Sequence, residues 1–178
     1  MSGGPGTDRV FLGESGTGDP SGPEIVSAPE AAVGDFDSER DAIRALLRKE
    51  FDTGLAGDHN EHIGCFDPSF VGFGAFGRPA TEWIVWGDHH TLIQYSEIHD
   101  AERPKSWKCS AEVMHIDTRG DVALAVSQHV DTWEEPEQKR SVRNHHETVW
   151  ILRKIGSEWR IVSWVWGSKH NQEVVYAT

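Results

Sequence analysis

The order of the segments constrains this fold most: helix-like sequence comes first, and four strand-like segments then follow with only short turns between them. The strand-like segments span 107–116, 122–133, 142–154 and 159–167. Gly-containing turns at 118–121 and 155–158 and a polar loop at 134–140 separate them. Consecutive strands with short connections form an antiparallel meander. We therefore expect an α+β protein and not a doubly wound parallel sheet.

The helix-like sequence precedes this meander. Ser38 and Asp41 resemble a capping box, and apolar residues then recur at helical spacing as far as Gly57-Asp58. A short helix is predicted near 59–65, a glycine-rich strand or hairpin at 70–76, and a third helix at 87–99. The pattern predicts one domain over 38–170, after an irregular Gly- and Pro-rich arm at 1–37 and before a tail at 171–178.

Composition narrows the classes of partner. The net charge of −12 disfavours binding to nucleic acid or to anionic membranes. The two cysteines, Cys65 and Cys109, cannot build a disulfide framework. The chain has no apolar run of about 18 residues and no pattern of a signal peptide. We therefore expect a cytoplasmic protein that binds neither nucleic acid nor membrane.

The last hairpin carries the most specific signature. The sequence TVWILR at 148–153 is followed, after a turn, by EWRIV at 158–162. With the earlier order of helix, Gly-Asp, short helix and Phe-Asp-Pro, it resembles the SnoaL-like branch of the nuclear transport factor 2-like superfamily over about residues 38–170. The resemblance implies a cone-shaped, curved antiparallel sheet that encloses a cavity with N-terminal helices. It also implies a homodimer.

Function does not follow from that resemblance alone. The superfamily includes polyketide cyclases, ketosteroid isomerases, scytalone dehydratases, epoxide hydrolases and non-catalytic binding or assembly domains. Steroid isomerases carry a pocket Tyr on the first helix and an Asp on the next strand, where this chain has Glu50 and either Phe73 or Gly74. The Arg-bridged Asp pair of the epoxide hydrolases has no clear match.

The expected register of the middle strands brings two histidines together. If the 133–141 loop closes the hairpin, His129 lies opposite His145, and Asp131 lies opposite Arg143. The preceding hairpin would place Cys109 beside His129, so that Cys109, His129 and His145 share one face.

This face suggests acid/base chemistry. Histidine titrates near neutral pH, so we predict His129 and His145 as acid/base groups, with Asp131 orienting a neighbouring imidazole. Alternatively, both histidines lie on the convex face or in a dimer interface. Cys109 and the two histidines could bind zinc, but their spacing is no known motif, and we expect no metal and no cofactor.

Further candidates lie on the first helix and on the last strand. Glu50 lies on the apolar helix face, where it could act as a base or could instead pair with an arginine or reach solvent. On the last strand, Trp164 and Trp166 alternate and so share one face. Aromatic cavity walls favour a flat or polycyclic ligand, although packing in the core would explain the same two tryptophans. The predicted ligand-binding residues are Trp164, Trp166, Trp86, Ser168 and Phe73.

Together these features predict a SnoaL-like domain that binds a small apolar or aromatic molecule. We expect a cofactor-independent enzyme that cyclises, isomerises or dehydrates a carbonyl substrate by acid/base chemistry. The alternative is a non-catalytic module for ligand binding or dimerisation. A cavity without a hydrogen-bonded acid/base pair would favour that alternative.

Overall fold

The structure, a computed structural model, describes residues 36–176. The arm expected at 1–37 lies outside these residues except for its last two, which belong to the first helix. The elements in chain order are α1 (Phe36–Ala56), α2 (His59–Ile63), β1 (Phe66–Gly74), η1 (Ala80–Glu82), β2 (Ile84–Trp86), α3 (His89–Glu102), β3 (Lys108–Arg119), β4 (Val122–Glu135), η2 (Pro136–Gln138), β5 (Arg140–Ile155) and β6 (Glu158–Tyr176).

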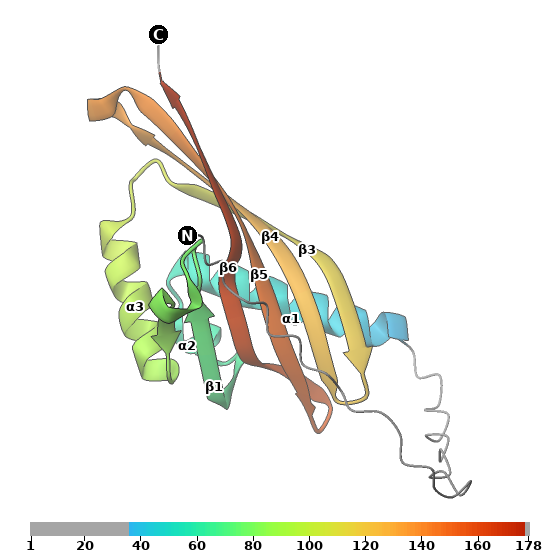
Figure 1. The fold of residues 1–178 in the computed structure, drawn as a ribbon. Coiled ribbons are helices and arrows are strands. Elements are labelled where there is room, and N and C mark those ends of the chain that lie inside the picture. The colour runs from blue at the N-terminus through green and yellow to red at the C-terminus, as the bar shows by residue number, and fades with distance from the viewer. Residues whose placement is uncertain (1–35, 177–178) are drawn as a thin grey trace, which may run out of the picture. The chain divides into compact units, whose positions relative to one another are not determined.

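One curved, six-stranded sheet organises these elements, in the order β2-β1-β6-β5-β4-β3 (Figure 1). The expected α+β class is confirmed, and the meander of β3 to β6 is antiparallel throughout. β1 joins the sheet parallel to β6, so the sheet as a whole is mixed. β6 continues to Tyr176 in register with β5, so residues 171–176 are strand where a tail was expected.

The loop between β4 and β5 sets a register that differs from the expected one by a single residue. η2 and Lys139, which has the left-handed φ of 49°, connect Glu135 to Arg140 as the first cross-strand pair. His129 therefore lies opposite His146 and not His145. Because side chains alternate between faces, this shift turns all of β5 over relative to the prediction.

The preceding hairpin also differs from expectation. Cys109 lies opposite Asp131, and Ala111 lies opposite His129, so the partner of Cys109 is two residues further along β4 than predicted. This difference of two residues keeps Cys109 on the predicted face of β3, because the side-chain period of a strand is two. A bulge between Val113 and His115 shifts the rest of the ladder.

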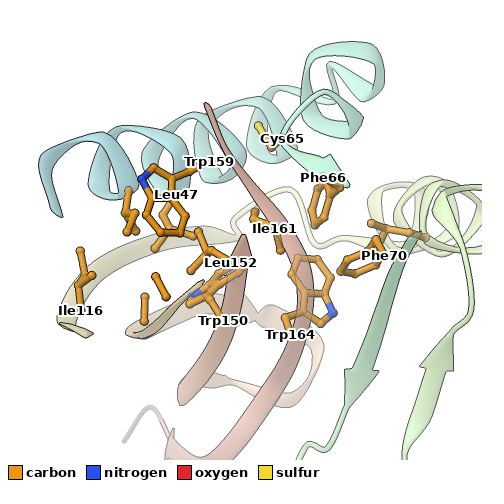
Figure 2. Close-up of a cluster of buried hydrophobic side chains, with 14 of the residues drawn as sticks. Leu47, Cys65, Phe66, Phe70, Ile116, Trp150, Leu152, Trp159, Ile161 and Trp164 are labelled. Carbon is orange, nitrogen blue, oxygen red and sulfur yellow. The ribbon is translucent and has the colours of Figure 1, made fainter. Parts of the chain in front are cut away.

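The hydrophobic core lies between α1 and the sheet face that this helix crosses (Figure 2). Ile43 and Leu47 of α1 are buried there with Leu152 and Ile161 of the last two strands. Burial of each such side chain stabilises the fold by about 1.5–3 kcal/mol. The core thereby fixes α1 across the sheet and leaves room beside it for the site.

α3 closes the other side of the space that the core leaves next to α1. Its first turn is fixed by a reciprocal capping box, in which the Asp88 carboxylate accepts from the Thr91 N–H at 2.8 Å. The helix then presents Leu92, which is buried, and Tyr95, whose ring is 5.0 Å from that of Trp86.

Candidate functional site

A cavity of about 220 Å³ lies between the helices and the sheet. α1, α2 and α3 supply one side of its lining, and β3 to β6 supply the other. Three cross-strand pairs of polar residues lie on this face of β4 and β5. They are Asp131 with Asn144, His129 with His146, and Ser127 with Thr148.

The central pair is a stack of two buried imidazoles. The rings of His129 and His146 lie 4.8 Å apart between centroids and are 8° from parallel. Burial lowers the pKa of His129 to about 4. Burial, together with the charge that His129 and His170 would carry, lowers the pKa of His146 to about 3. Both rings are therefore neutral near pH 7.

A chain of hydrogen bonds joins Trp150, Ser127 and His129. The Trp150 indole N–H donates to the Ser127 hydroxyl oxygen at 2.8 Å, and the same oxygen lies 2.8 Å from His129 Nε2. The Ser127 O–H can in turn donate to Nε2. In the tautomer that accepts this bond, the His129 proton resides on Nδ1, and the ring can donate a hydrogen bond from there.

His146 is held at both nitrogens. The Trp166 indole N–H donates to its Nε2 at 2.8 Å, and its Nδ1 lies 3.5 Å from Asp131 Oδ2. The indole can only donate, so Nε2 carries a lone pair and Nδ1 carries the proton. With Nε2 engaged by Trp166, His146 positions its neighbours and is not placed to take a proton from a ligand.

Asp131 also accepts from the thiol of Cys109. Burial and the carboxylate of Asp131 raise the pKa of this thiol well above its usual range, so it stays protonated. The zinc alternative required Cys109, His129 and His145 on one face, and the observed register does not bring them together. Among residues 37–98 and 101–176, whose side chains the structure describes, no group of three or more His, Cys, Asp or Glu is arranged to hold a metal ion.

Across the cavity lies a second acid/base pair. Glu50 of α1 and His62 of α2 are both buried, and Glu50 Oε1 lies 3.0 Å from His62 Nε2. Both residues line the cavity. Glu50 thus pairs with an imidazole, and not with the arginine considered as one alternative. His62 was not predicted, although its place on a short helix directly after the Gly57-Asp58 break is the signal that could have found it.

The predicted aromatic wall is only partly at the cavity surface. Trp164 and Trp166 line the cavity, whereas Trp86 lies behind them, with its ring 5.9 Å from each. Gly72 of β1 lets Trp164 sit against that strand. A Cβ atom on Gly72 would lie 2.7 Å from Phe70 Cζ and 2.9 Å from Trp164 Cδ1.

Three predicted residues lie away from the cavity. The half-buried His145 is turned to the opposite face by the register of β5. Phe73 faces away because its neighbours on β1 turn toward the indoles, and its ring lies 6.4 Å from Trp83. Ser168 is exposed and donates to the Glu147 carbonyl at 3.2 Å, because the irregularity at Gly167 interrupts the alternation of β6.

The architecture is similar to that of several solved structures. A ketosteroid isomerase-like protein from Erwinia carotovora atroseptica SCRI1043 superposes with a TM-score of 0.56 at 17% identity, over 73% of this chain and 95% of that one. A protein from Novosphingobium aromaticivorans, proposed to be an aromatic ring hydroxylase, gives 0.60 at 11% identity, over 78% and 94%. An NTF2-like protein of unknown function from Shewanella baltica OS155 gives 0.56 at 19% identity, over 78% and 96%.

The chain therefore has the nuclear transport factor 2-like fold, as the sequence resemblance implied. At these identities the likeness establishes the fold and leaves the chemistry to the site. No family profile and no curated protein matches the sequence. None of the helices in residues 36–176 is long and apolar enough to cross a membrane.

Proposed function

We propose that the cavity binds a small apolar carbonyl compound and transfers a proton at the carbon next to its carbonyl group, without a cofactor. The observation that carries this proposal is the pairing of two kinds of polar group around one cavity. The helices contribute the hydrogen-bonded Glu50 and His62, and the sheet contributes the neutral imidazole of His129.

In this mechanism Glu50 is the base. Its carboxylate removes the proton, and His62 holds the carboxyl group in place through Oε1. His129 donates from Nδ1 to the carbonyl oxygen as negative charge develops there. A neutral imidazole suits this role, because it stabilises an enolate without first having to be protonated. Enolisation of this kind is the step that isomerisation, dehydration and cyclisation of ketones have in common.

The size of the cavity limits the ligand. At about 220 Å³ it is smaller than the ~300–1,000 Å³ of pockets for drug-sized ligands. The ligand that fits has one or two rings and is smaller than the polycyclic molecule that the tryptophans suggested. The walls of Trp150, Trp164 and Trp166 favour an aromatic ring.

The test uses 2-tetralone, a bicyclic ketone with acidic protons next to the carbonyl group. Proton NMR in D₂O measures how fast these protons exchange for deuterium. We expect the protein to accelerate exchange, and Glu50→Gln to lower the protein-dependent rate by about a hundredfold or more. Glu147→Gln is the matched control, because Glu147 lies outside this cavity and pairs with Lys169. Exchange no faster than in buffer, or unchanged in Glu50→Gln, would refute the proposal.

The homodimer, the cytoplasmic location and the SnoaL-like branch stay predictions. An exposed apolar pair on the opposite sheet face supports the homodimer. Leu124 and Ile151 are cross-strand partners and are 43% and 41% exposed.

A further inference from the structure

We propose that a second cavity is a binding site for the carboxylate end of the ligand. This cavity, of about 300 Å³, lies between α1 and strands β3 and β4. It shares Glu50, Phe51, His129 and Trp150 with the first cavity, so these residues form the wall between the two. The rings of Phe51 and His129 are 6.0 Å apart across this wall.

The second cavity combines an apolar interior with two arginines on its α1 side. Leu47, Ala111 and Val113 line its interior. Arg44 and Arg48 line it from α1, one helical turn apart and therefore on the same face of the helix. Two adjacent cations at a cavity are notable in a chain whose net charge is −12. The combination fits an amphipathic anion.

Both arginines have nitrogens to spare for a ligand. Arg44 uses Nη1 to contact Asp41 at 2.8 Å, and Arg48 uses Nε to contact Asp52 at 2.9 Å. A guanidinium carries five N–H donors, and these solvent-exposed pairs engage one nitrogen of each. A ligand carboxylate can therefore bind beside the aspartates without displacing them.

One glutamate fixes the orientation of the ligand. Glu50 lies at the wall between the cavities and repels an anion there, so the apolar end of the ligand points inward and its anionic end lies at the arginines of α1. A planar carboxylate matches the fork of N–H donors that each guanidinium offers.

This inference deepens the proposed function, since it assigns a carboxylate to the ligand of the same site. The carbonyl end would lie near His129, and the carboxylate end would lie near Arg44 and Arg48. The substrate class is then an aromatic or aliphatic keto acid. The test below measures binding alone, so that it does not depend on turnover.

The test compares 4-phenylbutanoate with its neutral amide, 4-phenylbutanamide, by isothermal titration calorimetry. We expect the carboxylate to bind about tenfold more tightly, as two exposed charge contacts would give. The variant R44Q/R48Q should remove this preference. The variant R119Q/K169Q loses the same charge at exposed sites outside both cavities and should retain it. Equal affinities in the natural protein, or a preference retained in R44Q/R48Q, would overturn the inference.

A second variant tests where the probes bind. Ala111 lines the second cavity and not the first. Ala111→Leu should weaken binding of both probes at least threefold, because the larger side chain fills part of the second cavity. Probe affinity unchanged by Ala111→Leu would place the probes elsewhere and would also overturn the inference. If the natural protein does not accelerate deuterium exchange of 2-tetralone but still prefers the carboxylate probe, only the proposed function would be refuted.

Discussion

His129 and His146 stack face to face as cross-strand partners, with their ring centroids 4.8 Å apart. Two parallel imidazoles at this distance are compatible only while at most one of them is charged. Burial already holds both neutral. The stack therefore ties the stability of the sheet to pH.

We predict that the protein loses stability as pH falls below 6.5. The unfolded chain takes up protons at both histidines near pH 6.5, whereas the folded pKa values are about 4 for His129 and about 3 for His146. The unfolded state thus binds more protons over this interval, so the unfolding free energy falls as pH falls, and the loss levels off below about pH 3. Between pH 6.5 and 4 each histidine contributes a loss on the order of 3 kcal/mol.

Urea denaturation at several pH values measures this effect. The double variant H129Q/H146Q should show a smaller change between pH 6.5 and 4 than the natural protein. Parallel pH profiles for the two proteins would contradict the prediction.

The two hydroxyls of one cross-strand pair should respond in opposite ways to removal. Ser127→Ala leaves the buried Trp150 N–H and His129 Nε2 without their shared partner, and it should cost about 1–3 kcal/mol. Thr148 is also buried, but its hydroxyl has no partner among the described residues, so Thr148→Val should be neutral or stabilising. Urea denaturation at pH 7 compares the two variants, and equal losses would contradict the assigned hydrogen bonds.

Gly72 should resist even the smallest side chain. Gly72→Ala places a methyl group 2.7 Å from Phe70 Cζ and 2.9 Å from Trp164 Cδ1, so the wall of the cavity must move. We expect a loss of about 1–3 kcal/mol and a changed near-ultraviolet circular dichroism spectrum from the displaced indole. Gly87→Ala is the matched control, since a methyl group there meets no atom within 4 Å. If Gly72→Ala were as stable as this control, the residues around Gly72 would accommodate the methyl group at no cost, and the prediction would be wrong.

Trp166 should determine the titration of His146. In the natural protein, long-range ¹H–¹⁵N NMR should show the proton of His146 on Nδ1, because the Trp166 N–H occupies Nε2. Trp166→Phe removes this donor and leaves Nε2 able to take up a proton. The pKa of His146 should then rise from its value of about 3. A proton on Nε2 in the natural protein would contradict the assignment.

The sequence predicted the arrangement of the fold better than that of the site, for a physical reason. Hairpin signals such as Gly120 and Gly156, both with positive φ, mark turns locally, so the meander could be read from the chain. Which face a residue occupies depends instead on the exact length of each loop. Lys139 in the left-handed conformation adds the one residue that placed His146, and not its neighbour, in the cavity.

The long-range contacts of the site could not be predicted from the sequence for the same reason. Glu50 was identified by its place on an apolar helix face, but its partner His62 depends on how α2 turns back toward α1. The relay from Trp150 through Ser127 joins residues that are far apart in the chain. Ser127 carries no local pattern that distinguishes it from a surface serine. Only the observed pairing of strands brings these groups together.

The four-residue loop that joins β4 to β5 has a consequence for how such a site can change. The register that this loop sets turns Asn144, His146 and Thr148 to the cavity and, on the same face of β5, Trp150 and Leu152 to the core. A slip of β5 by one residue would therefore expose Trp150 and Leu152 as well as exchange the cavity residues. In this fold, the packing of the core thus protects the ligand-binding face of β5 against changes in the length of the loop.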